Sequence, residues 1–157
     1  MLFRRPLAAM LAAWIACAPT PVPAEPTEEN PLAAQLDPDY AAGKLAIEAG
    51  QWSAAIKRLS SAALRDTRNA DIQNYLGYAH RQLGEMDAAF RHYELALKLN
   101  PRHRGAHEYV GEAYLMVGNP GKALVHLDAL RKICLIPCEE MKDLEQAIAD
   151  YQAGNKR

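Results

Sequence analysis

Apolar side chains recur through the middle of the chain with the three-to-four-residue spacing of amphipathic helices. In one such stretch the apolar positions are Leu76, Leu83, Phe90, Tyr93 and Leu97. Near the C-terminus a single apolar stripe is formed by Met141, Leu144, Ile148 and Tyr151. Charged residues occupy the remaining positions of that segment, as expected for a helix with one buried face. The pattern predicts an all-α protein.

Four sets of residues return at intervals of 34 positions. These columns are Gly43, Gly77 and Gly111; Gly50, Gly84 and Gly118; Ala55, Ala89 and Ala123; and Leu59, Tyr93 and Leu127. Because the columns stay in register without a gap, they indicate three repeats, at residues 36–69, 70–103 and 104–137. One helical hairpin cannot bury its apolar face alone, so stacked neighbours must complete the core.

Each repeat is predicted to hold two helices. Asp37-Pro38 and Asn119-Pro120 are helix starts, with a capping side chain followed by proline in the first turn. Pro101 stops the second helix of the second repeat. The second glycine of each repeat marks the break between its two helices, where a positive φ is needed. The small residues of the columns that begin at Gly43 and Ala55 let the paired helices approach closely.

Residues 70–101 resemble a tetratricopeptide repeat along their whole length. The matching positions are Leu76-Gly77, Ala89, Tyr93, Ala96 and Pro101. The third repeat keeps Gly111, Tyr114 and Ala123 but has Leu130 where alanine is usual, and the first has Ala46 in place of the usual tyrosine. The resemblance implies a right-handed superhelical stack of three hairpins that binds other proteins.

Residues 138–157 follow the last repeat and are predicted to form a capping helix and tail, with the helix running over residues 137–153. Glu139 and Glu140 favour its positive N-terminal end. The apolar stripe of this helix would cover the exposed end of the last hairpin. Leu130 in place of alanine would then fit this different neighbour.

The first 24 residues have the features of a signal peptide. Arg4 and Arg5 precede an uncharged apolar stretch at residues 7–16, and Ala24 provides a cleavage position before Glu25. The apolar stretch is too short to span a bilayer. Residues 25–35 form a Pro-rich linker, so we expect a periplasmic or secreted protein of a bacterium. Lipidation at Cys17 would instead make a membrane-anchored lipoprotein.

The charge balance argues against two classes of partner. The 157-residue chain has a net charge of −1, and loss of the signal peptide would change it to −3. Binding to nucleic acid or to an anionic membrane needs a concentrated basic face, and the sequence shows no run of lysine and arginine. No phosphate-binding glycine loop, nucleophile elbow or zinc-protease motif is present either. We therefore expect neither an enzyme nor a bound cofactor.

Cys134 and Cys138 are the cysteine pair left after export. Four residues apart on a helix, their Cα atoms would lie about 6 Å from each other, within disulfide range. In an oxidising compartment such a pair favours a disulfide. A copper or thiol-redox accessory site is the alternative. The histidines indicate no metal site, and His92 and His126 are predicted to face outward.

The family resemblance places a concave groove on the first helices of the repeats. By that analogy the groove residues are Tyr40, Lys44, Ile47, Asn74, Tyr75, Tyr78, Arg81, Glu108, Tyr109, Glu112 and Leu115. Tyrosines with mixed charges suit an extended peptide or a helix of a partner protein. The alternative for Tyr75 and Tyr109 is packing between repeats. The family's clamp for a partner's C-terminal carboxylate needs several lysines, arginines and asparagines, and the two glutamates disfavour it.

Two further expectations follow from this groove. Charge reversal at Arg81 and Glu112 is expected to leave the helical fold intact and to abolish capture of the partner. Self-association through an exposed end of the repeat stack is a weaker alternative.

Overall fold

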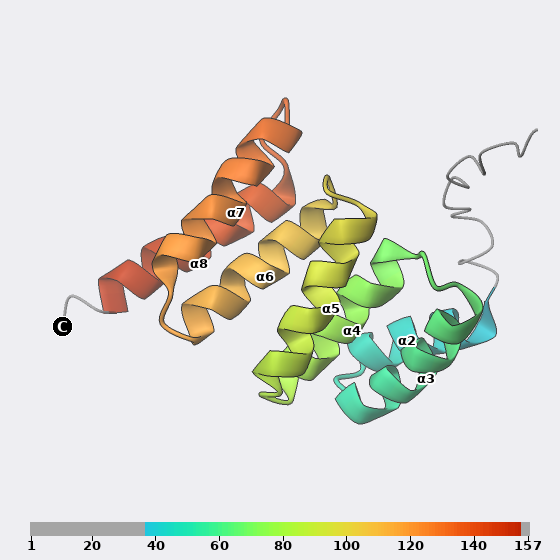
Figure 1. Cartoon of the computed structure of the whole chain (residues 1–157). Helices are drawn as coiled ribbons and strands as arrows, with labels where there is room; N and C mark the ends of the chain where they lie inside the picture. The colour runs from blue at the N-terminus through green and yellow to red at the C-terminus, as the bar shows by residue number, and fades with distance from the viewer. Residues whose placement is uncertain (1–36, 155–157) are drawn as a thin grey trace, which may run out of the picture.

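The computed structural model describes residues 37–154, and within them every element of regular structure is a helix. Seven helices succeed one another along the chain: α2 (Pro38–Glu48), α3 (Trp52–Arg65), α4 (Ala70–Gln82), α5 (Met86–Leu99), α6 (Arg104–Met116), α7 (Pro120–Ile133) and α8 (Glu139–Gly154). They form three antiparallel hairpins, α2–α3, α4–α5 and α6–α7, stacked side by side, with α8 against the last one (Figure 1). This confirms the predicted all-α superhelical stack.

The helix ends follow the predicted local signals. The N–H groups of Asp39 and Tyr40 donate to Asp37 Oδ1 at 2.9 and 3.0 Å, with Pro38 opening α2. The N–H of Lys122 donates to Asn119 Oδ1 at 3.2 Å before α7. The three glycines between paired helices all have positive φ, from 66° to 75°. Such a backbone is unstrained only for glycine, which explains their regular return.

Close contacts at glycine hold the first two hairpins together. A Cβ built on Gly43 would lie 2.6 Å from Leu59 Cγ, and one on Gly77 would lie 2.6 Å from Tyr93 Cδ1. Both Leu59 and Tyr93 are completely buried. The 34-residue columns of glycine and large residues therefore face each other across the first two hairpins.

The third hairpin departs from this scheme. The side chain nearest to Gly111 belongs to Leu144 of α8, whose Cδ1 would lie 2.7 Å from a Cβ on that glycine. Leu130, Leu144 and Ile148 share one core cluster, and the first two are completely buried. The cap helix thus enters the place that the preceding hairpins fill with their own second helix, and Leu130 contacts it there.

The cap helix begins two residues later than predicted. Its first backbone hydrogen bond runs from the N–H of Lys142 to the carbonyl of Cys138, so α8 starts at Glu139. Between α7 and α8 the chain bends, and Leu135 and Ile136 are 98% and 81% exposed. Residues 134–138 are therefore a turn, and the cysteine pair does not lie on a regular helix.

The predicted signal peptide, the linker and Cys17 lie outside the described residues. Of the helices that the structure describes, none combines the length and apolarity needed to cross a membrane.

Candidate partner-binding groove

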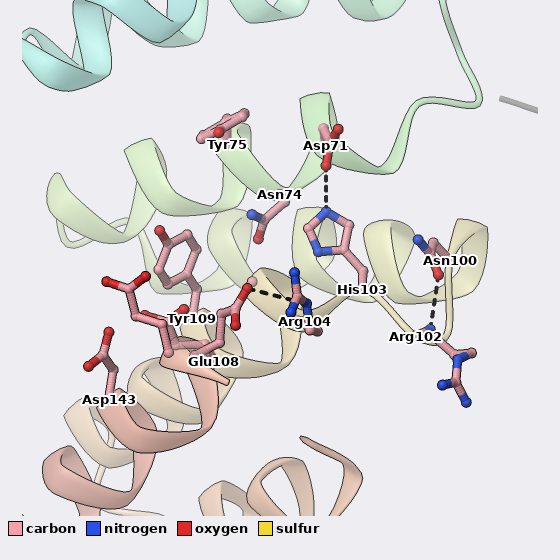
Figure 2. Close-up of a pocket in the computed structure, with 13 residues that line it drawn as sticks. Asp71, Asn74, Tyr75, Asn100, Arg102, His103, Arg104, Glu108, Tyr109 and Asp143 are labelled. Atoms are coloured by element: carbon pink, nitrogen blue, oxygen red, sulfur yellow. Dashed lines mark hydrogen bonds and ion pairs between the residues drawn. The ribbon is translucent and has the colours of Figure 1, made fainter. Parts of the chain in front are cut away.

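Two hollows lie along α6, each bounded by α4 on one side and α8 on the other. The larger, of about 560 Å³, lies at the start of α6 (Figure 2). Its main lining residues are Asp71, Asn74, Tyr75, His103, Arg104, Glu108, Tyr109, Glu139, Glu140 and Asp143. The smaller, of about 360 Å³, lies at the end of α6 and is lined by Arg81, Glu112, Leu115, Met116, Ala147 and Tyr151. We name them the Glu108 pocket and the Met116 pocket.

Seven of the eleven predicted groove residues line one of the two pockets. Asn74, Tyr75, Glu108 and Tyr109 line the Glu108 pocket, whereas Arg81, Glu112 and Leu115 line the Met116 pocket. Tyr78 and the three residues of α2 line neither. Tyr40 is 6% exposed and belongs to the core around the first hairpin, against which Ile47 packs, and Lys44 Nζ lies over the rings of Tyr40 and Tyr75.

Aromatic contacts connect neighbouring repeats. The ring centroids of Tyr78 and Tyr109 are 4.9 Å apart, and those of Tyr40 and Tyr75 are 6.2 Å apart. Trp52 of the first hairpin meets Tyr78 edge-on at 5.8 Å. Tyr75 and Tyr109 therefore pack between repeats, yet both stay half-buried and line the Glu108 pocket.

Arg81 links the second and third repeats. It is 7% exposed and forms an ion pair with Glu112 of α6. Its guanidinium carbon lies 5.1 Å from the ring centroid of Tyr78 and 5.5 Å from that of Tyr109, within cation–π range. Loss of its charge would leave the partly buried carboxylate of Glu112 without its partner, which is destabilising. Arg81 and Glu112 are thus part of the interface between repeats as well as of the groove.

Glu108 has an unusual environment for a carboxyl group. It is 9% exposed, and burial raises its pKa from 4.5 to about 8, with the nearby carboxylates Glu112, Asp143 and Glu140 adding to the effect. Arg81 lowers the pKa by a smaller amount. Its surroundings therefore favour the protonated form of Glu108 when the groove is empty.

The family analogy did not include α8 in the groove. Glu139, Glu140 and Asp143 border one pocket, and Ala147 and Tyr151 border the other. The apolar stripe of this helix indicated which side would be buried. Nothing in the sequence indicated that the polar face of α8 would border the pockets along α6.

The prediction that His92 and His126 face outward is wrong. His92 Nδ1 donates to Gln73 Oε1 at 2.8 Å, and His126 Nδ1 lies 3.0 Å from His107 Nδ1. Because His107 Nε2–H donates to the carbonyl of Pro101, its Nδ1 accepts the proton of His126. Each pair joins the two helices of one hairpin, which explains why the contact recurs after 34 residues.

The Cα atoms of Cys134 and Cys138 are 5.9 Å apart, within the range that a disulfide spans. The turn after α7 thus brings the two residues together without a helix. Within residues 37–154, no group of three or more histidine, cysteine, aspartate or glutamate side chains converges as metal ligands.

A family model described as "Tetratricopeptide repeat" matches residues 40–101, which span α2 to α5. Residues 40–101 therefore carry tetratricopeptide repeats. The match covers the first two hairpins, and α6–α7 repeats their architecture. None of the curated proteins matches this sequence.

Several solved structures share this architecture. The Yersinia enterocolitica type III secretion translocator chaperone SycD is 15% identical, with a TM-score of 0.69 over 80% of this chain and 88% of SycD. PcrH, in complex with the chaperone-binding region of PopD, is 21% identical, with a TM-score of 0.65 over 80% of this chain and 94% of PcrH. MamA MSR-1 is 23% identical, with a TM-score of 0.56 over 60% of this chain. The chain spans 55% of MamA. At these identities the likeness shows the fold.

Proposed function

We propose that this protein is a non-enzymatic scaffold that holds a segment of a partner protein in the groove between α4, α6 and α8. The observation that carries the proposal is the position of the Glu108 and Met116 pockets, which lie along one helix and are both bordered by the same two neighbours. Tyrosines and an ion pair connect them. A continuous surface with aromatic anchors suits a peptide segment.

The similar folds support this proposal. SycD is a translocator chaperone, and PcrH binds a region of PopD, so stacks of this size hold segments of other proteins. SycD has also been solved as an alternative dimer, which keeps self-association among the outcomes to be measured. Sedimentation of the purified protein distinguishes a self-associated form from a monomer.

The compartment that we propose is the bacterial cell envelope. It rests on the signal-peptide features of residues 1–24 and on the cysteine pair. The Cα separation of 5.9 Å between Cys134 and Cys138 favours a disulfide, and disulfides persist in oxidising compartments. We propose that this bond holds the turn from which α8 starts, and thereby the third wall of the groove.

The test of the groove is capture of partners from the native cell envelope by wild-type protein and by Met116→Glu. Met116 lines the Met116 pocket and is 61% exposed, so a glutamate there changes the surface with little effect on the core. A charge reversal at Arg81 would instead disturb the interface between repeats. Val125→Glu is the matched control, because Val125 is 63% exposed on α7 and lines neither pocket.

We expect a partner that is retained by the wild type and by Val125→Glu and lost by Met116→Glu. Circular dichroism of the three proteins must show equal helicity. Equal capture by all three would show that partners bind elsewhere, and absence of a partner with the wild type would contradict the scaffold proposal.

A further inference from the structure

The Glu108 pocket has more acidic than basic groups on its walls. Five carboxyl groups line it: Asp71, Glu108, Glu139, Glu140 and Asp143. The basic groups are Arg102 and Arg104, together with His103. Several of these groups already have a partner within the pocket. His103 Nε2 donates to Asp71 Oδ1 at 2.9 Å, and Arg104 Nε lies 3.4 Å from Glu140 Oε1. The remaining charge in the pocket is negative.

Glu108 is the buried acid without a counter-charge. Arg81, whose charge lowers the pKa of Glu108, is paired with Glu112, and Arg104 is paired with Glu140. Within residues 37–154, no ion pair or side-chain hydrogen bond includes Glu108, although it is nine-tenths buried. Buried carboxyl groups are normally hydrogen-bonded or paired, so this one is suited to a partner supplied from outside.

A second buried polar group beside Glu108 also lacks a partner. Asn74 of α4 is 4% exposed, and its Oδ1 makes no hydrogen bond with any described residue. Figure 2 shows its amide between His103 and Tyr109, pointing from α4 toward the start of α6. Gly105 leaves room there, because a Cβ at that position would lie 3.3 Å from Asn74 Nδ2. As no hydrogen bond fixes the amide, rotation about its terminal torsion can turn the oxygen toward the pocket.

The walls next to these two groups are aromatic. Tyr75 and Tyr109 both line the pocket and are half-buried. Aromatic faces stabilise a nearby ammonium or guanidinium group, and so do carboxylate and amide oxygens. A carboxylate ligand, by contrast, would meet the carboxylates of Glu139, Glu140 and Asp143. The chemistry of the pocket therefore selects a cation.

We propose that the Glu108 pocket receives a lysine or arginine side chain of the partner segment, with Glu108 and Asn74 as hydrogen-bond acceptors and Tyr75 and Tyr109 as its aromatic walls. This inference rests on the proposed scaffold function and adds the charge of the segment that is bound. The incoming cation favours the ionised form of Glu108.

The test uses a phage-displayed library of random 12-residue peptides, selected on the purified wild-type protein. We expect enrichment of peptides that carry lysine or arginine at one fixed position relative to their other shared residues. For a selected peptide, replacement of that residue by norleucine or glutamine should weaken binding at least about tenfold, which corresponds to one charge-assisted hydrogen bond.

The protein variant that tests the pocket is Glu108→Gln, which keeps the side-chain shape. It should weaken binding of the basic peptide at least about tenfold, and it should bind the norleucine peptide as the wild type does. Glu94→Gln is the matched control, because Glu94 is exposed on α5 and outside both pockets. Circular dichroism and thermal melting establish that both variants are folded.

The outcomes separate this inference from the proposed function. Selected peptides that lose binding to Met116→Glu but show no preference for a basic residue would overturn the basic-side-chain inference and support the groove. Equal affinity of the basic peptide for Glu108→Gln and the wild type would also overturn it. A library from which no peptide is enriched would contradict both proposals.

Discussion

Replacement of Glu108 by glutamine should stabilise the unliganded protein, and the gain should grow with pH. Burial raises the pKa of Glu108 from 4.5 to about 8, and the carboxylates of Glu112, Asp143 and Glu140 add to this, whereas Arg81 opposes it. At a pH between these two pKa values, Glu108 keeps its proton in the folded protein, whereas the unfolded chain has released it. The stability that this proton provides is complete below pH 4.5 and is lost as the pH rises through 8.

The size of the effect follows from that window. Each pH unit inside it reduces the free energy of unfolding of the wild type by at most about 1.4 kcal/mol, which is the linkage of one proton. From pH 5 to pH 8 the upper limit is therefore about 4 kcal/mol. Because Glu108 borders a pocket open to solvent, screening reduces the effect, and we expect on the order of 2 kcal/mol. Glutamine does not ionise, so the variant lacks this dependence.

The assay is urea denaturation followed by circular dichroism at pH 5, 6.5 and 8, for the wild type, Glu108→Gln and Glu94→Gln. The free energy of unfolding of Glu108→Gln minus that of the wild type should increase steadily with pH. The same difference for Glu94→Gln should stay constant, because Glu94 is exposed. Parallel curves for Glu108→Gln and the wild type would refute the reasoning, since they would show that Glu108 ionises as freely in the folded protein as in the unfolded chain.

Three further predictions concern the helix contacts. Gly77→Ala should lower the stability of the protein by about 2 kcal/mol in thermal melts, because the new Cβ would lie 2.6 Å from the Tyr93 ring. Gly84→Ala is the comparison: its only strain is the φ of 75°, so it should lower the stability by about 1 kcal/mol. Burial lowers the pKa of His92 and His126 to about 4, so stability should fall as pH drops from about 6.5 to 4. A double His→Gln variant should lose that slope in denaturation measured across this range, and an unchanged slope would assign it to other groups. Replacing both cysteines by serine should lower the free energy of urea unfolding by about 2 kcal/mol, and a thiol assay that finds both cysteines free in the wild type would contradict the disulfide.

The repeat architecture could be predicted from the sequence because local and periodic signals coincide. Asp37-Pro38 and Asn119-Pro120 are helix starts wherever they occur in a helical pattern, and the structure uses them so. The glycines with positive φ return every 34 residues because every hairpin needs the same turn. These features depend on nearest neighbours along the chain or in the same hairpin, so a single sequence reveals them.

The buried polar contacts could not be predicted in the same way. A histidine on a second helix, such as His126, has the same local pattern whether it faces solvent or its partner His107. Whether such a histidine is buried depends on which residue of the neighbouring helix lies opposite it, and the packing between the helices determines that. The recurrence of the contact after 34 residues, with Gln73 and His92 in the second hairpin, was the signal that could have indicated it.

The placement of α8 decides what the groove can bind, and it depends on two residues that depart from the repeat pattern. Leu130 stands where the preceding repeats have a small alanine, and it is completely buried in the core cluster that also contains Leu144. Leu144 in turn occupies the space beside Gly111 that Leu59 and Tyr93 fill in the earlier hairpins. The larger residue at 130 and the free space at 111 therefore draw the cap helix onto α6. That position brings the carboxylates of α8 to the Glu108 pocket, so a substitution for packing in the last repeat also sets the charge of the binding surface.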